Sequence, residues 1–215
     1  ALRQGMLNDH DQLPTLHGQR VRLRWLTADD APFTFGSFNA SSKISETTAA
    51  LWAATLAAVP GSRLLLKSLA MGDPDASGAL RDRLARAGID PARVDISAYA
   101  PDQRSHLEQY ARMHVSLDTT PYNGATTTCE ALWMGVPVVT LLGDRHAARV
   151  SASLLHAAGN PEWVAADADA YVRIAASLAQ DRERLKPLRT DLRAQMLASP
   201  LLDAAAYATR FHAAL

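Results

Sequence analysis

An alternation of short apolar runs of β type with longer helical stretches constrains the fold of this chain most. The β-type runs are residues 33–38, 63–67, 94–98, 114–117 and 137–142, and the helical stretches between them are 45–59, 76–87, 104–112 and 126–134. Parallel strands need a crossover connection, which a helix usually supplies, so this alternation is typical of a mostly parallel sheet covered by helices. We therefore predict an α/β fold with a Rossmann-like, doubly wound sheet.

The C-terminal part carries more helix than a five-stranded unit needs. Helical patterns follow at residues 146–158, 169–180, 181–197 and 202–215, and we expect them to pack back across the sheet or onto a neighbouring domain. Residues 1–30 have no helical partner, so we interpret them as a linker or an extra edge strand. Residues 31–215 would form one α/β lobe.

Charge, cysteine content and hydropathy exclude several classes of protein. The 22 basic and 22 acidic residues cancel, which argues against binding nucleic acid or an anionic membrane through a basic face. No run approaches the roughly 20 apolar residues of a transmembrane helix. The single cysteine, Cys129, excludes an internal disulfide and favours a reducing, cytoplasmic compartment. Because the chain opens with Ala1 and no signal sequence, we expect a piece of a longer protein.

The loop after residues 114–117 is the strongest candidate for a ligand site, since ligands of open α/β sheets bind beyond the carboxyl ends of the strands. Asn123-Gly124 makes a turn that would let a ligand approach the backbone, and three threonines, Thr126–Thr128, open the next helix. Such threonines and the helix dipole attract phosphate oxygens, while Glu130 could accept hydrogen bonds from ribose hydroxyls. An ordinary N-cap with an acidic first turn is the alternative, but it explains one threonine and not three.

Three other strand-to-helix loops carry weaker signals. Lys43, one of 3 lysines against 19 arginines, follows the first strand and could neutralise a phosphate, although it could equally be a solvated surface lysine. The loop at residues 99–102 could read a nucleobase edge through its backbone. His106 lies on the helix that follows, and taken alone it is more typical of a partly exposed helix histidine than of a ligand contact. Residues 143–149 have the character of a capped, solvated turn.

Motifs of other nucleotide and metal enzymes are absent from the sequence. There is no Walker lysine loop, no Gly-x-Gly-x-x-Gly after the first strand and no zinc-ligand spacing. The acidic pairs Asp73-Pro74-Asp75 and Asp167-Ala168-Asp169 flank helices, and we interpret them as solvated turns. We therefore predict neither a metal nor a cofactor.

Three segments together resemble one family. Residues 32–44 (PFTFGSFNASSKI), residues 51–67 and above all residues 117–155, which contain NGATTTCEALWMGVPVVT, resemble the O-linked N-acetylglucosamine transferase and SPINDLY-like glycosyltransferases, in particular their bacterial members with tetratricopeptide repeats. The resemblance covers about residues 31–215. It implies that this chain is the C-terminal, donor-binding lobe of a two-lobed GT-B enzyme, with an N-terminal catalytic lobe and repeats as its partners.

The resemblance also implies roles for individual residues. Lys43 would contact the donor diphosphate and so carry the catalytic role. The other donor-binding residues would be Ala125 near the diphosphate, Thr126 and Thr127 at the phosphates, Glu130 at the ribose, Ala100 through its backbone at the base, and His106 beside the base. Animal members have glutamine where Ala40 stands, histidine where Ala125 stands, and basic residues where Glu108 and Gln109 stand. Here Ala125 would leave the phosphate grip to the backbone, the threonines and Lys43.

The function implied is metal-independent, inverting transfer of a sugar from a nucleotide sugar, UDP-GlcNAc by preference over GDP-fucose, to serine or threonine hydroxyls of a protein. A catalytic base is not visible in this chain. Two other functions stay open at this point: a nucleotide-sugar isomerase of the 2-epimerase kind with the same two-lobed architecture, and a non-catalytic nucleotide-sensing module on a repeat scaffold.

Overall fold

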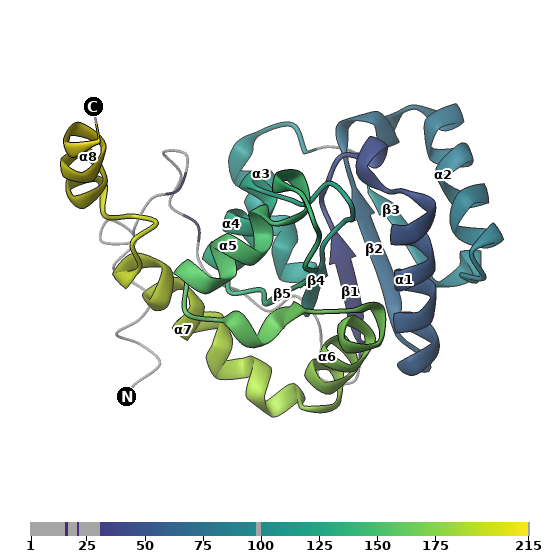
Figure 1. The fold of residues 1–215 in the computed structure, drawn as a ribbon. Coiled ribbons are helices and arrows are strands. Elements are labelled where there is room, and N and C mark those ends of the chain that lie inside the picture. Colours follow the sequence, from purple (N-terminus) through teal and green to yellow (C-terminus); the bar gives the residue numbers. More distant parts are fainter. Residues whose placement is uncertain (1–15, 17–20, 22–30, 98–99, 215) are drawn as a thin grey trace.

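A sheet of six parallel strands in the spatial order β3-β2-β1-β4-β5-β6 forms the centre of the lobe (Figure 1). The computed structural model describes residues 16, 21, 31–97 and 100–214. The strands are Thr34–Ser37 (β1), Arg63–Lys67 (β2), Val94–Ser97 (β3), Val115–Leu117 (β4), Val138–Leu141 (β5) and Val164–Ala165 (β6). The predicted doubly wound α/β fold is confirmed. The strand order reverses between β1 and β4, and in such sheets ligands bind at that point.

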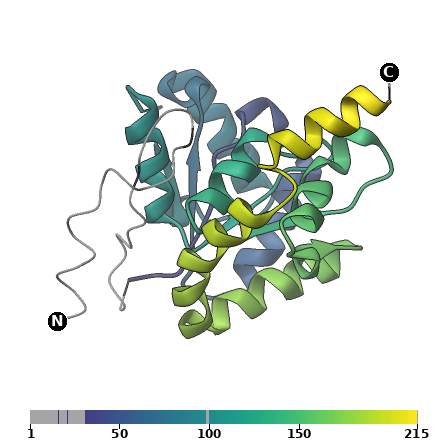
Figure 2. The same ribbon diagram turned by 90° about the vertical axis from the view of Figure 1, so that its left-hand side faces the viewer.

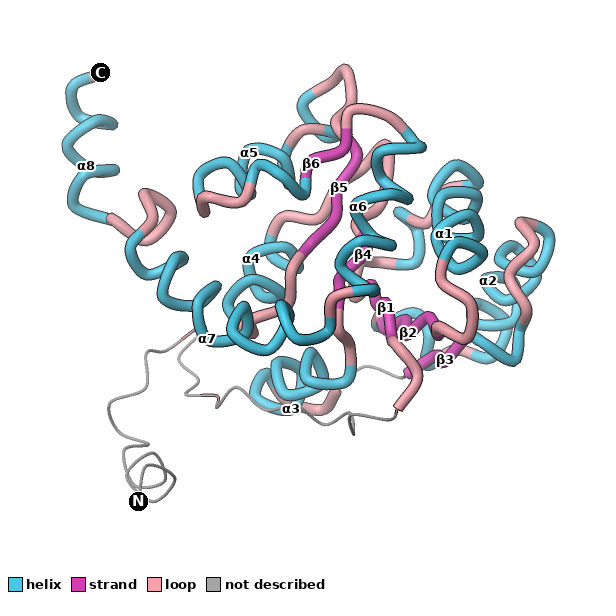
Figure 3. Tube along the Cα trace, turned by 90° about the horizontal axis from the view of Figure 1, so that it is seen from below, coloured by secondary structure: helices cyan, strands magenta, loops and turns pink. Residues whose placement is uncertain are grey.

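Helices cover both faces of the sheet. Figure 3 shows α1, α2 and α6 on one side of the strands and α3, α4 and α5 on the other. Contacts agree with this arrangement, because α1 packs against α6, and α4 contacts α5 and α7. The helices are Glu46–Ala58 (α1), Pro74–Arg86 (α2), Gln103–Glu108 (α3), Thr126–Trp133 (α4), Val150–Ala157 (α5), Ala168–Gln180 (α6), Arg182–Ala198 (α7) and Ala204–Ala213 (α8).

Both acidic pairs of metal-chelating appearance are helix caps. The side chain of Asp73 accepts a hydrogen bond from the Ala76 N–H at 2.9 Å at the start of α2. Asp167 accepts one from the Ala170 N–H at 2.7 Å at the start of α6. Each aspartate satisfies one of the N–H groups that a helix start leaves without an internal partner. Their interpretation as helix-flanking turns is confirmed.

The structure differs from the predicted elements in three places. The predicted helix over residues 146–158 is divided into a 3-10 turn, His146–Ala148, and α5. β6 was not predicted, because two residues, Val164 and Ala165, are too few to show an alternating pattern; they pair with Thr140 and Leu141 of β5. The predicted helix over residues 104–112 is split into α3 and a 3-10 turn, Gln109–Arg112.

The C-terminal helix α7 fastens onto the lobe through buried arginines. Arg193 Nε donates to the Trp133 carbonyl at 2.8 Å, and its Nη1 donates to the Val21 carbonyl at 2.9 Å. Arg189 Nη2 donates to the Met113 carbonyl at 2.6 Å. For α7, these contacts confirm the prediction that the C-terminal helices pack back onto the lobe.

By contrast, α8 extends away from the body of the lobe, and none of its residues is buried (Figures 1 and 2). Apart from Leu16 and Val21, the predicted linker or edge strand over residues 1–30 lies outside the described residues. Among the helices of the described part of the chain, none has both the length and the apolar character needed to cross a membrane.

Candidate functional site at the strand-order reversal

The loops that follow β1 and β4 meet at the reversal of strand order. They connect through Asn39, at the end of the first strand, whose side-chain Nδ2 donates to Asp118 Oδ1 at 3.3 Å. Both residues are buried. Because the carboxyl ends of the parallel strands face the same edge of the sheet, residues 79 positions apart in sequence are brought into one site.

Asp118 holds the loop between β4 and α4 in place. Its carboxylate accepts hydrogen bonds from the Gly124 N–H at 2.8 Å and from Thr140 Oγ1 at 2.7 Å. Burial raises the pKa of Asp118, and these hydrogen bonds act in the opposite direction because they favour the ionised form. The sequence interpretation missed Asp118. Its position directly after a buried strand could have indicated its importance.

The helix start at Thr126 is open to an anion. Ala125 occupies the N-cap position of α4 and provides no side-chain cap, so no side chain covers the first N–H groups there. Thr126 is exposed. The Thr127 hydroxyl donates to Asn39 Oδ1 at 2.9 Å, and the buried Thr128 hydroxyl lies 2.8 Å from Ser151 Oγ. Of the three threonines, only Thr126 is therefore both exposed and without a hydrogen bond to another of these loops.

Gly124 has a packing role that the sequence did not suggest. We expected its missing side chain to let a ligand approach the backbone. The residue is buried, and a Cβ at this position would lie 2.6 Å from Thr127 Oγ1 and 2.7 Å from Thr128 Oγ1. The glycine is required because the loop packs directly against the first turn of α4.

Lys43 reaches across the reversal point to the same loop. It ends a 3-10 turn, Ser41–Lys43, and its Nζ donates to the Asn123 carbonyl at 2.9 Å and lies 4.2 Å from the centroid of the Tyr122 ring. Burial lowers the pKa of Lys43, while the negative charge of Asp118 acts to raise it. Lys43 and the loop before α4, which the sequence analysis singled out separately, thus lie side by side.

A second polar cluster, which we call the Lys67 cluster, consists of Lys67, His106, Tyr110 and Glu130. Lys67 Nζ lies 2.9 Å from His106 Nδ1. His106 Nε2 lies 2.8 Å from Glu130 Oε2, and the Tyr110 hydroxyl donates to the same oxygen at 3.0 Å. All four side chains are buried. His106 and Glu130 were predicted from the sequence, whereas Lys67 and Tyr110 were not.

Burial shifts the titration of two members of the Lys67 cluster. It lowers the pKa of Lys67 to about 7; the carboxylate of Glu130 opposes this shift and the Arg112 guanidinium adds to it. Burial also raises the pKa of Tyr110 well above its ordinary value, with the Glu130 charge acting in the same direction. Tyr110 therefore stays a hydrogen-bond donor, whereas Lys67 is poised to change charge near neutral pH.

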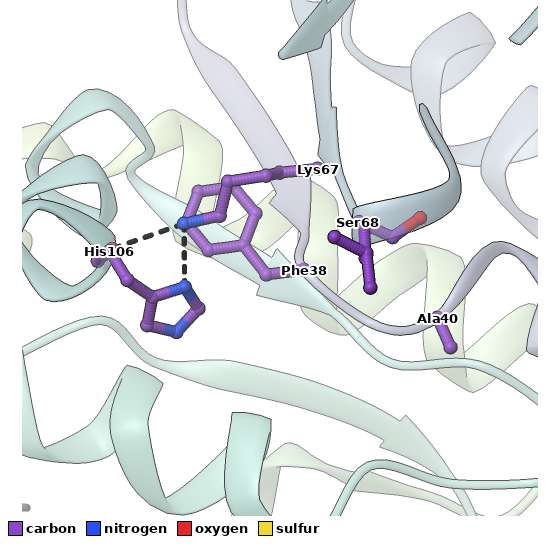
Figure 4. Close-up of a pocket in the computed structure, with 6 residues that line it drawn as sticks. Phe38, Ala40, Lys67, Ser68 and His106 are labelled. Atoms are coloured by element: carbon purple, nitrogen blue, oxygen red, sulfur yellow. Dashed lines mark hydrogen bonds between the residues drawn. The ribbon is translucent and has the colours of Figure 1, made fainter. Parts of the chain in front are cut away.

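A cavity of about 190 Å³ adjoins the Lys67 cluster (Figure 4). It lies beyond the carboxyl ends of β1 and β2, and its walls are formed by Phe38, Ala40, Lys67, Ser68, Leu69 and His106. The buried Ser68 hydroxyl has no hydrogen-bond partner among the described residues. The cavity thus combines an apolar wall with an ammonium group and a free hydroxyl.

The other residues singled out in the sequence make no side-chain contact with Lys43 or with the Lys67 cluster among the contacts described above. Ala100 is buried, and its neighbours 98 and 99 lie outside the described residues. Ala125 is exposed at the start of α4. Asp144 and Arg145 form an exposed ion pair at 3.1 Å, as expected for a solvated turn.

A parallel sheet with this strand order, an open helix start and a cationic side chain at the reversal form a Rossmann-like lobe of the kind found in GT-B glycosyltransferases. Residues 13–211 match the family described as glycosyl transferase family 41. The chain belongs to this family, which confirms the resemblance noted in the sequence.

Individual relatives agree with this assignment. A protein of Petunia hybrida described as a probable UDP-N-acetylglucosamine–peptide N-acetylglucosaminyltransferase SPINDLY is 43% identical over 174 residues, which cover 81% of this chain and 19% of the relative. A mutant O-GlcNAc transferase of Thermobaculum terrenum has 38% identity and a TM-score of 0.80, with 89% of this chain and 36% of that chain covered. The chain therefore spans about a fifth of the length of its plant relative.

A more distant structure shares the fold alone. The C-terminal domain of a group 1 glycosyl transferase from Francisella tularensis has 13% identity and a TM-score of 0.56, and the match covers 77% of this chain and 85% of that domain. The architecture of the lobe thus extends beyond the sequence family.

Proposed function

We propose that this chain is the donor-binding lobe of an inverting glycosyltransferase that moves a sugar from UDP-GlcNAc to serine or threonine hydroxyls of a protein. The observation that carries this proposal is the meeting of Lys43 with the uncapped start of α4 at the strand-order reversal. Two sources of positive potential there suit a diphosphate. The descriptions of the family relatives name UDP-N-acetylglucosamine and a peptide, which supports UDP-GlcNAc as the donor and a peptide as the acceptor.

The proposed reaction is a single displacement. The acceptor oxygen attacks the anomeric carbon, the bond from that carbon to the diphosphate oxygen breaks, and negative charge develops on the leaving nucleoside diphosphate. Lys43 and the N–H groups of α4 would stabilise that charge, which is the task of preorganised donors in a transition state. We propose that these groups of the protein, and no metal ion or cofactor, neutralise the leaving group.

The rest of the donor would extend from α4 toward the Lys67 cluster. Thr126 and Thr127 would bind the phosphates, the latter mainly through its backbone because its hydroxyl is engaged by Asn39. Glu130 would accept from the ribose, His106 would pack near the base, and Ala100 would read the base edge through its backbone.

The complete enzyme would need parts beyond this lobe. We propose that a second, N-terminal catalytic lobe and tetratricopeptide repeats complete it, that the acceptor's proton is taken by a group outside this chain, and that the protein is a bacterial enzyme of the cytoplasm. The short coverage of the plant relative is compatible with such additional parts.

Calorimetric titration of the chain with UDP, GDP and ADP tests the proposal. We expect UDP to bind most tightly and the Lys43→Ala variant to bind it more weakly. A preference for GDP would replace the donor by a GDP-sugar. Absence of binding by any nucleotide would reject the donor-binding function and favour a scaffold.

A further inference from the structure

Lys67 is buried in the cluster that borders the proposed nucleotide site, and the proposed function assigns it no role. It ends β2, is 1% exposed, and its Nζ lies 4.0 Å from the centroid of the Phe38 ring. The same Nζ donates to the His106 carbonyl at 3.1 Å and lies 2.9 Å from His106 Nδ1. Two contacts to one residue, seen in part in Figure 4, tie the ammonium group to His106.

These contacts determine where His106 carries its proton. A lysine ammonium has three donors and no acceptor, so Nδ1 must accept from it. The ring proton of neutral His106 then sits on Nε2, which donates to Glu130 Oε2 at 2.8 Å. Hydrogen bonds therefore run in one direction, from Lys67 through His106 to Glu130.

This series of hydrogen bonds ends at the Glu130 carboxylate, which is the group proposed to accept hydrogen bonds from the ribose. His106 Nε2 and the Tyr110 hydroxyl both donate short hydrogen bonds to Glu130 Oε2. Oε1 receives a longer bond, 3.4 Å, from Gln103 Nε2. A ribose hydroxyl would thus meet a carboxylate that hydrogen bonds from other elements already hold in place.

We propose that the Lys67 ammonium is a positioning group for the nucleotide: it fixes the tautomer of His106 and thereby holds the Glu130 carboxylate in the orientation in which it would meet the ribose. This inference rests on the proposed function, because Glu130 is taken as the ribose acceptor. Lys67 acts through His106 and is not itself a catalytic residue. Its positive charge also balances the buried Glu130 carboxylate, which would be costly to bury alone.

The charge of Lys67 makes nucleotide affinity depend on pH. The charged and titratable groups that face it are His106 of α3, Tyr110 and Arg112 of the 3-10 turn, and Glu130 of α4. Because its pKa is lowered to about 7, the ammonium form dominates below pH 7 and is lost above it. The ammonium form is the one that fixes His106 and balances Glu130, so nucleotide binding favours it and affinity should fall as the pH rises through 7.

The test combines two variants with two measurements on the whole chain. Lys67→Met keeps the apolar stem but removes charge and donors, Lys67→Arg keeps the charge at all relevant pH values, and Lys186→Met is a matched control at an exposed lysine of α7. Nitrogen-15 NMR reports the His106 tautomer without nucleotide. Calorimetry with UDP-GlcNAc, whose diphosphate does not titrate in this range, gives the affinity from about pH 6 to 8.5.

We expect Lys67→Met to lose the Nε2–H tautomer and to bind UDP-GlcNAc about tenfold more weakly at pH 6, the effect expected for one hydrogen bond to a charged group. Lys67→Arg should bind with little pH dependence, and Lys186→Met should behave as the wild type. If Lys67→Met keeps the tautomer and the affinity, the positioning role is overturned. A flat wild-type profile overturns it too, even if Lys67→Met does not fold.

The outcomes separate this inference from the function on which it rests. Failure of the wild type to bind UDP-GlcNAc at any pH rejects the proposed function. Normal wild-type binding together with an unaffected Lys67→Met variant rejects the role of Lys67 alone.

Discussion

At the scale of single residues, Lys43 is the side chain whose removal should cost the reaction most. Its Nζ is already oriented by the Asn123 carbonyl at 2.9 Å, so little reorganisation is needed to meet a diphosphate. In the complete enzyme we expect Lys43→Ala to lower kcat by about 10²-fold, the size of effect measured for one preorganised donor. Steady-state kinetics would show it, with Lys186→Ala as the control. A loss below threefold would contradict the role.

His114 gives a pH dependence of stability that is independent of any ligand. Its Nδ1 accepts from the Thr34 N–H at 3.0 Å, and burial, with the charges of Arg182 and Arg189, lowers its pKa from 6.5 to about 4. The unfolded chain therefore binds the proton first, and the stabilisation present above pH 6.5 is lost as the pH falls toward 4.

The variant His114→Asn retains an acceptor and does not titrate. We expect its free energy of unfolding, measured by urea denaturation, to fall less steeply than that of the wild type between pH 6.5 and 4. Parallel curves for the two proteins would show that His114 is not responsible.

A site residue could be predicted from the sequence only where neighbouring residues in the same segment indicate its role. Lys43 and Thr126 stand next to a strand end or a helix start, and short-range patterns are sufficient to find such positions. Lys67 and Asp118 acquire their meaning from partners on other elements: Lys67 meets His106 39 positions away, and Asp118 meets Asn39 79 positions away. No pattern within one segment encodes those pairings.

At the scale of elements, the junction of the β4 loop with α4 depends on the absence of a side chain at Gly124. We expect Gly124→Ala to lower the free energy of unfolding by about 1–3 kcal/mol, as overpacking does, and to weaken UDP binding. Gly78→Ala is the matched control, because a Cβ there meets open space within α2 and alanine favours helix by about 0.5–1 kcal/mol. Urea denaturation measures both, and equal stability of the two variants would argue against the tight packing.

The elements themselves were largely predictable. Five strands and the helices between them follow from apolar runs whose length and spacing suit a parallel sheet, and their ends carry caps or glycines. Neither β6 nor the 3-10 turn after α3 leaves such a signal, because the strand is two residues long and the turn differs from a helix only in its hydrogen bonding.

At the scale of the whole molecule, α7 and α8 differ in their importance to the fold. Arg189 and Arg193 of α7 are buried against carbonyl groups of the lobe, whereas α8 has no buried residue. We expect deletion of residues 204–215 to change the free energy of unfolding by less than about 0.5 kcal/mol, as exposed substitutions do. Deletion from residue 182 onward should prevent folding. Urea denaturation and circular dichroism distinguish the two, and a loss above 2 kcal/mol for the shorter deletion would contradict the prediction.

The central position of β1 has a consequence for how the lobe is made. β1, the first of the strands that the structure describes, pairs with β4 in the middle of the sheet, and Lys43 reaches a carbonyl 80 residues later. During synthesis, the first half of the lobe therefore emerges with one edge of β1 unpaired and with half of a nucleotide pocket. Long-range pairing of this kind slows folding because loop-closure entropy is lost before the contacts form. A nascent chain released before residue 127 would hold the lysine but have no helix for the phosphate to meet.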